Sequence, residues 1–181
     1  MEMMEAIFKR RSIRHFEDKA IPEPVLNSVL EAIQWSPSWA NTQCWEIVVV
    51  KDTSVKERLQ EAVGRNPASK AMVQAPVVLV FCYTKNRSGF YNAQESTILG
   101  DWGMFDLGIA TQSAALAAHD AGLGTVVVGL FDHRKVSDIL GVPAEMQVVS
   151  MLPLGYPARD GKAPPRRALA DFVHTDRFSK E

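Results

Sequence analysis

The chain has 181 residues, of which 46% are hydrophobic and 23% charged, and its formal net charge is -1. This composition is ordinary for a folded globular protein, and the length suits a single domain over residues 1–181. A net charge so close to zero gives no overall field for nucleic acid or an anionic membrane, so we expect neither as a partner. No segment approaches the roughly 20 apolar residues of a membrane span, and the start of the chain does not resemble a signal peptide. Cys44 and Cys82 form no C-x-x-C pair, and we expect a cytoplasmic protein without disulfides.

Apolar periodicity predicts helices that alternate with strands along the chain. The expected elements of the first half are a helix over 2–9, an extended segment over 10–16, a helix after Pro24 to about Trp35, a polar loop over 38–43 and a strand over 45–50. The second half is expected to contain strands over 76–83, 125–128 and 147–154, and helices over 102–121 and 132–140. Ser54 and Glu57 have the spacing of a capping box, which predicts the start of a further helix between these halves.

Four stretches define the expected architecture. Residues 76–83 are almost wholly apolar, as expected of a central strand covered on both faces. The polar stretch 84–100 is expected to be a mobile lid, while 102–121 is apolar all around and predicts a helix buried on most sides. Residues 168–181 have too little apolar content to form a core and are expected to be an arm. The sequence therefore predicts an α+β fold, with a mixed sheet of about four or five strands and helices on both faces.

Arg10, Ser12 and Arg14 are spaced by two residues, so an extended backbone projects all three side chains to one side. Two guanidinium groups and a hydroxyl that converge suit a phosphate, because each arginine can donate two charge-assisted hydrogen bonds. A solvated basic face after the first helix is the commoner explanation for such a short motif. Arg166 and Arg167 follow two prolines, which stiffen the chain, and either an aimed pair of charges or a solvated tail fits them.

The polar loop before the first strand offers donors and acceptors for the edge of a planar heterocycle, chiefly Asn41 and Gln43. An ordinary loop that ends a helix is the alternative. The chain contains neither a Walker-type phosphate loop nor G-x-G-x-x-G, and no G-x-S-x-G supports serine catalysis. The four histidines have no metal-ligand spacing, so no metal site is expected. Cys44 has no evident partner that would activate it as a nucleophile.

The order of these motifs resembles the nitroreductase family over nearly the whole chain. The matching features are a helix leading into R-R-S-x-R-x-F, S-P-S-x-x-N-x-Q-x-W before a valine-rich strand, A-P-V-V from Ala75, G-x-A-x-Q from Gly108, the turn over 122–125 and the terminal basic pair. The resemblance implies a homodimer with FMN sites at the subunit interface and a C-terminal arm that crosses to the partner subunit.

The resemblance also implies the residues that bind FMN. The phosphate and pyrimidine edge would be held by Arg10, Arg11, Ser12 and Arg14, with Arg167 as a C-terminal phosphate contact. The loop lent by the partner subunit would comprise Pro37, Ser38 and Trp39, with Asn41 and Gln43 close by. The backbone beside the flavin would be Val128, Gly129 and Leu130. Asn66 and Lys70 are alternative counterparts of one further family position.

The implied activity is ping-pong hydride transfer, in which NADH or NADPH reduces FMN and an aromatic acceptor, such as a nitro compound or quinone, reoxidises it. No side-chain acid or base is expected, and Arg14 is expected to stabilise the reduced flavin. The substrate face is expected to involve Trp39, Phe90, Tyr91 and Trp102. Two departures from the family pattern bear on substrate choice: Cys44 stands where proline is usual, and Trp39 where a small residue is common.

Two other functions fit the same scaffold. A reductive dehalogenase needs charged lid residues that grip a zwitterionic substrate, for which Lys85, Arg87 and Glu95 are available. A flavin-binding module without turnover would keep the cofactor site and lack reduction by NAD(P)H. A nucleic-acid binder that uses the basic clusters is disfavoured by the net charge of -1.

Overall fold

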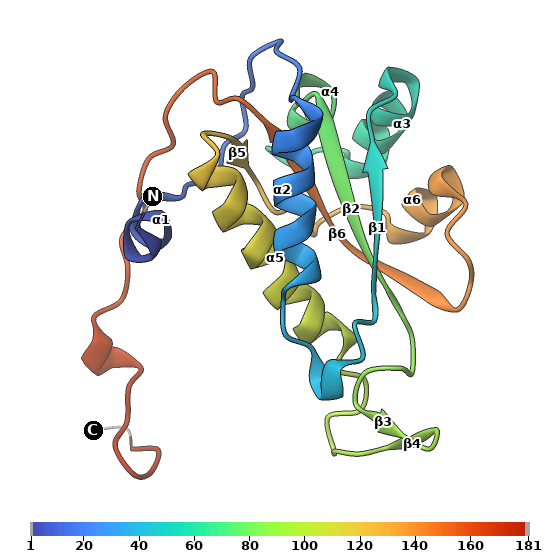
Figure 1. The fold of residues 1–181 in the computed structure, drawn as a ribbon, viewed down its shortest axis with the longest axis vertical. Helices are drawn as coiled ribbons and strands as arrows, with labels where there is room; N and C mark the ends of the chain where they lie inside the picture. Colours follow the sequence, from blue (N-terminus) through green and yellow to red (C-terminus); the bar gives the residue numbers. More distant parts are fainter. Residues whose placement is uncertain (1, 180–181) are drawn as a thin grey trace.

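The computed structural model describes residues 2–179 and contains a four-stranded sheet in the order β1-β2-β6-β5 (Figure 1). The strands are β1 (Trp45–Val50), β2 (Val77–Thr84), β5 (Gly124–Thr125) and β6 (Met146–Gly155). Each neighbouring pair is antiparallel, and one isolated parallel bridge joins Ser12 to Thr125. The predicted α+β class is confirmed.

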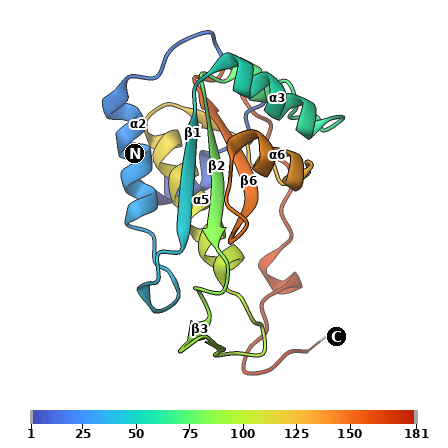
Figure 2. The same ribbon diagram turned by 90° about the vertical axis from the view of Figure 1, so that its right-hand side faces the viewer.

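Helices cover both faces of this sheet, as Figure 2 shows. The helices α2 (Glu23–Gln34) and α5 (Gly103–Asp120) pack on one face. The helices α3 (Thr53–Val63), α4 (Ala71–Gln74) and α6 (His133–Leu140) pack on the other. The short helix α1 (Met3–Lys9) contacts α5. No helix in the described part of the chain is long and apolar enough to cross a membrane.

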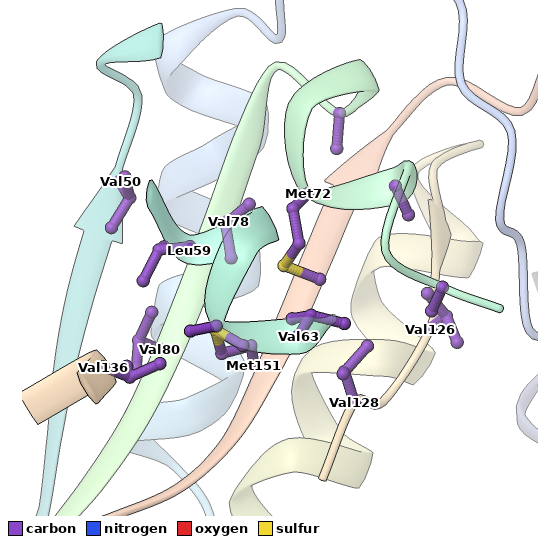
Figure 3. Close-up of a cluster of buried hydrophobic side chains, with 14 of the residues drawn as sticks. Val50, Leu59, Val63, Met72, Val78, Val80, Val126, Val128, Val136 and Met151 are labelled. Atoms are coloured by element: carbon purple, nitrogen blue, oxygen red, sulfur yellow. The ribbon is translucent and has the colours of Figure 1, made fainter. Parts of the chain in front are cut away.

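Strand β2 is the centre of the molecule, because its side chains alternate between two cores. Val78, Val80 and Cys82 belong to the core under α3, α4 and α6, part of which Figure 3 shows. Val77, Leu79 and Phe81 belong to the core under α2 and α5. A strand reads as continuously apolar when both of its faces are covered, so the prediction for residues 76–83 is confirmed.

Two local predictions were wrong. Helix α3 begins at Thr53, and its N-cap is Asp52, whose carboxylate accepts the Val55 N–H at 3.0 Å. Ser54 donates to the same carboxylate instead of forming a capping box, because aspartate is itself a strong N-cap residue. The strand expected over 125–128 ends at Thr125, since Val126 turns into the core and only Val128 pairs again, with Met151.

The lid and the arm have little regular structure. The lid contains a small hairpin of β3 (Phe90–Tyr91) and β4 (Gln94–Glu95), located beside the turn η1 (Trp39–Asn41) at the lower end of Figure 1. Beyond β6 the chain passes α1 and continues as an extended arm with one turn, η2 (Leu169–Asp171). The lid and the chain beyond β6 leave the sheet at opposite ends, because the end of β6 pairs with the start of β2. The arm then runs back along the molecule toward the end that carries the lid (Figure 1).

Candidate functional site

A cationic cavity of about 490 Å³ lies between the segment after α1 and the start of the arm. Five arginines and one lysine line it against one aspartate. Its charged lining residues are Arg10, Arg11, Arg14, Arg159, Asp160, Lys162 and Arg166. Ser12 and His15 also contribute. Such a set of donors matches a phosphate group, because guanidinium groups bind phosphate oxygens with paired charge-assisted bonds.

The segment 10–14 is held by the buried residue Ile13. Its N–H donates to the Thr125 carbonyl at 2.8 Å, and its side chain packs on Gly124, where an added Cβ would lie 2.6 Å from the Ile13 side chain. With Ile13 turned inward, alternation directs Ser12 and Arg14 outward, and both are exposed. The structure thus gathers Arg10, Ser12 and Arg14 around one cavity, as their spacing predicts.

The positive groups around the cavity repel one another, which favours binding of an anion. Burial, together with repulsion from Arg11 and Arg166, lowers the pKa of Arg10. Burial and the charges of Arg10 and Arg11 likewise lower the pKa of His119, which lies beside them. None of the ion pairs between described residues involves these arginines. A bound anion would relieve this repulsion.

The two arginines at the start of the arm have different surroundings. Arg166 lines the cavity and donates to the Pro164 carbonyl at 3.1 Å. Arg167 donates to the Asp171 carbonyl within the arm and lies over the Phe172 ring at 5.6 Å. Arg159 and Lys162, which lie between β6 and the arm, also line the cavity, although no motif singled them out. The only sequence signal for them was the change to a basic, proline-rich composition after Gly155.

The segment 128–130 leaves open space in front of its backbone. Val128 pairs with Met151, and a Cβ added at Gly129 would meet no atom within 4 Å. The Leu130 side chain is exposed, and its carbonyl accepts from the Asn66 amide at 3.2 Å. Of the two alternatives for the further family position, Asn66 is therefore the one that lies beside this segment.

An apolar groove of about 780 Å³ continues from Gly129 along α5. Met104, Leu107 and Val127 contribute its apolar surface, and Gln112 and Gln147 contribute polar groups. This is the shape and chemistry of a site for a flat, mostly apolar ring with a few polar edges.

The loop 37–43 does not meet the cationic cavity within one chain. Neither Pro37, Ser38 nor any residue of η1 lines that cavity, and Figure 1 places the loop beside the lid. Within the loop, the Ser38 hydroxyl accepts the Gln43 N–H at 2.9 Å, and the Gln43 amide donates to Asn41 at 3.2 Å. The loop is thus an ordered unit whose polar edge faces outward.

The four predicted substrate-face residues lie in or near the lid. Tyr91 is exposed and Phe90 half-buried, both in β3. The Trp102 indole donates to the Thr97 hydroxyl at 2.9 Å and packs edge-on against Phe105. Trp102 therefore joins the end of the lid to the start of α5. Trp39 is half-buried in the neighbouring loop.

Cys44 is not a nucleophile in this setting. Burial and the nearby Asp106 carboxylate raise the pKa of its thiol to about 12, so the thiol is protonated at neutral pH. Its Sγ lies 3.6 Å from Asp106 Oδ2, to which it donates. Burial also raises the pKa of Cys82 to about 11. Among the described residues, no group of three histidine, cysteine or carboxylate side chains could hold a metal.

Sequence comparison identifies relatives of known family. The model of the nitroreductase family matches residues 7–156. The FMN reductase [NAD(P)H] of Bacillus subtilis (strain 168) is 31% identical over 98% of this chain and 74% of its own. Iodotyrosine deiodinase 1 of Mus musculus is 28% identical over 96% of this chain and 69% of its own.

Structural comparison leads to the same group. The NADPH:FMN oxidoreductase of Vibrio harveyi, solved in complex with NAD+, superimposes with a TM-score of 0.85 at 28% identity. The superposition covers 99% of this chain and 79% of that one. The likeness therefore includes the sheet, both helical layers and the arm.

Proposed function

The chain belongs to the nitroreductase family, and from this premise we propose that it is an FMN-dependent oxidoreductase. It uses NADH or NADPH to reduce nitroaromatic, quinone or related aromatic acceptors. The observations that carry the proposal are the cationic cavity and the open backbone at Gly129, in a family member. FMN, when bound, supplies the hydride chemistry, and the protein holds and orients it.

The residues present fit FMN at both ends of that molecule. Arg10, Ser12 and Arg14, with Arg11 beside them, provide the donors for a phosphate and a pyrimidine edge. Gly129 provides a backbone that no side chain shields, and Val128 and Leu130 flank it. Gly129 is four positions along the chain from Thr125, which is bridged to Ser12, so Thr125 and Gly129 are at most about 14 Å apart.

The chain acts as a homodimer that assembles each flavin site from two subunits. Large apolar side chains stay exposed on α1, on α5 and on the arm, namely Met3, Met4, Ile7, Phe8, Met104, Phe105, Leu169, Phe172, Val173 and Phe178. Exposed apolar side chains of this kind are candidates for a subunit interface. The loop with Pro37, Ser38 and Trp39 lies away from the cavity of its own chain and is free to complete the site of a partner. Arg167 then reaches a phosphate from the crossing arm.

Reductive dehalogenation has less support. Lys85, Arg87 and Glu95 lie exposed on the lid, and none of them lines the cationic cavity or the apolar groove. A zwitterionic substrate needs charges that converge at the flavin. A cytoplasmic location suits the two free thiols, Cys44 and Cys82, because a reducing compartment keeps thiols free.

The test of this function is an absorption spectrum of the purified protein with FMN, followed by anaerobic addition of NADH or NADPH. Flavin bands that bleach with reductant and return with a nitroaromatic or quinone are the expected result. Bands that persist would favour a binding module without turnover. A protein that takes up no FMN would overturn the proposal. Return of the bands with iodotyrosine but not with a nitroaromatic would favour dehalogenation.

A further inference from the structure

A single buried carboxylate on α5 joins two other segments of the chain. Asp106, in the first turn of α5, is 0% exposed. Its Oδ1 accepts the Trp39 backbone N–H at 3.0 Å. Its Oδ2 accepts the Ser88 hydroxyl at 2.5 Å and faces the Cys44 thiol at 3.6 Å. The start of the loop at Trp39, its end at Cys44 just before β1, and the root of the lid therefore meet at one group.

The surroundings of Asp106 are arranged for a charged acceptor. Burying a carboxylate is costly unless hydrogen bonds replace its hydration. Here donors approach both oxygens, and the N-terminal turn of an 18-residue helix favours negative charge. Asp106 stands in an otherwise apolar stretch of this helix, and that isolation is the sequence signal that could have marked it.

The loop that Asp106 holds is conformationally strained. Ala40, Asn41 and Gln43 all have positive φ, at 46°, 56° and 45°. Non-glycine residues adopt this region rarely, and several in succession persist only when the surroundings fix them. The bond to the Trp39 N–H ties the beginning of this strained turn to the rigid α5.

The same carboxylate fixes the root of the lid. Ser88 is 0% exposed, and besides its bond to Asp106 its carbonyl accepts the Trp102 N–H at 3.0 Å. Gly89 follows with φ of 86° and packs so closely that an added Cβ would lie 2.5 Å from the Gly100 carbonyl oxygen. The lid root and the loop are therefore held by the same carboxylate.

We propose that Asp106 is a positioning residue: it fixes the Trp39 loop, which completes the flavin site of the partner subunit, in register with the lid of its own subunit. The proposal rests on the proposed function, because it needs a dimer with flavin between the subunits. Asp106 itself does not touch the cofactor. Its effect is exerted in trans, on the flavin held by the arginines of the other chain.

Heterodimers with one working cavity test this trans effect. Two subunits carrying different affinity tags are co-expressed, and one of them has its cavity disabled by Arg10→Ala and Arg14→Ala. The change Asp106→Asn, which keeps the volume but leaves one acceptor oxygen, is placed on either subunit. FMN affinity is measured by flavin fluorescence, and the bound ring is monitored by visible circular dichroism.

The two placements have different expected results. With Asp106→Asn on the subunit whose cavity is disabled, the remaining flavin meets the altered loop, and its Kd rises about tenfold. With the same change on the subunit whose cavity is intact, the flavin meets a normal loop, and its Kd and dichroism stay at the parental values. Equal effects from both placements, or no effect from either, would overturn the proposal.

Three further samples make the result specific. Ser88→Ala removes one donor to Oδ2 of Asp106. It should raise the FMN Kd less than Asp106→Asn does, and again only when placed on the subunit whose cavity is disabled. This variant replaces Asp106→Asn in the test if the latter fails to fold. Asp52→Ala, which removes the distant N-cap of α3, should lower stability without a trans effect. The parental heterodimer must bind one FMN. If it binds none, the proposed flavin site fails, and this inference fails with it.

Discussion

Most side chains of the central strands of the sheet are buried within the chain, whereas large apolar side chains on α1, α5 and the arm are exposed. Strands β2 and β6 bury almost every side chain, and Gly124 and Gly155 have neighbours so close that a Cβ would clash. On the outer surface, by contrast, Phe8 and Phe105 are 65% and 60% exposed. The first region is complete within one chain, while the second is the surface proposed to contact the partner subunit. Stability and function should therefore respond to different substitutions.

The largest expected effect follows from emptying the cationic cavity of charge. Arg10→Ala combined with Arg14→Ala should raise the FMN Kd at least about a hundredfold, because each arginine contributes charge-assisted bonds of roughly 1.5–3 kcal/mol. The free energy of unfolding of the flavin-free protein, measured with urea, should not fall, because Arg11 and Arg166 repel Arg10 in the folded chain. The matched control is Arg58→Ala with Arg134→Ala, two exposed arginines on α3 and α6. Equal FMN losses in both pairs would contradict this assignment.

A charge on the outer face of α5 should separate the subunits. Phe105→Glu places a carboxylate in the apolar surface proposed as the interface, and the dimer Kd should rise about a hundredfold or more. Analytical ultracentrifugation over a range of concentrations measures this, with Arg58→Glu on α3 as the control. FMN affinity should fall together with dimerisation. An undisturbed dimer would remove α5 from the interface.

Substitutions at two glycines should affect FMN binding and the stability of the fold separately. Gly155→Ala forces a Cβ to within 2.6 Å of the Pro76 side chain, and overpacking of this kind costs about 1–3 kcal/mol of unfolding free energy. The Cβ that Gly129→Val adds meets no protein atom within 4 Å, so the fold should keep its stability while the FMN Kd rises about tenfold. Urea unfolding and FMN titration of both variants test the contrast. The opposite assignment of effects would refute the open site at Gly129.

The smallest expected effect concerns His119. Burial and the charges of Arg10 and Arg11 lower the pKa of this imidazole below its usual value near 6.5. The unfolded chain therefore binds the proton more readily at this histidine. The stability that neutral His119 contributes is fully present above about pH 6.5 and is lost as the pH falls toward the lowered pKa. Phosphate in the cavity offsets the arginine charges, so FMN should raise the pKa of His119. An NMR titration with and without FMN measures this, and an unchanged pKa would place the phosphate elsewhere.

The regions also differ in how far they could be predicted from sequence. The apolar run of β2 and the spacing of Arg10, Ser12 and Arg14 are local patterns with a strict geometric meaning, and the structure reproduces both. The contributions of Arg159 and Lys162 depend on where the arm passes, which no local pattern states. Asp52 is the N-cap of α3 instead of the predicted Ser54, because aspartate and serine are both good N-cap residues and these two stand two positions apart. Asp106 was missed because its partners Trp39, Cys44 and Ser88 lie in two other segments of the chain, which no local pattern connects to α5.

The central claim is that one chain provides only part of each flavin site, and sedimentation velocity followed at the flavin absorption band tests it most directly. We expect all bound flavin to sediment with a species twice the mass of the chain, at one FMN per subunit. The Phe105→Glu variant should show a single-chain species without flavin absorbance. Flavin that sediments stoichiometrically with the single chain would contradict the account, because the cavity would then be complete without a partner.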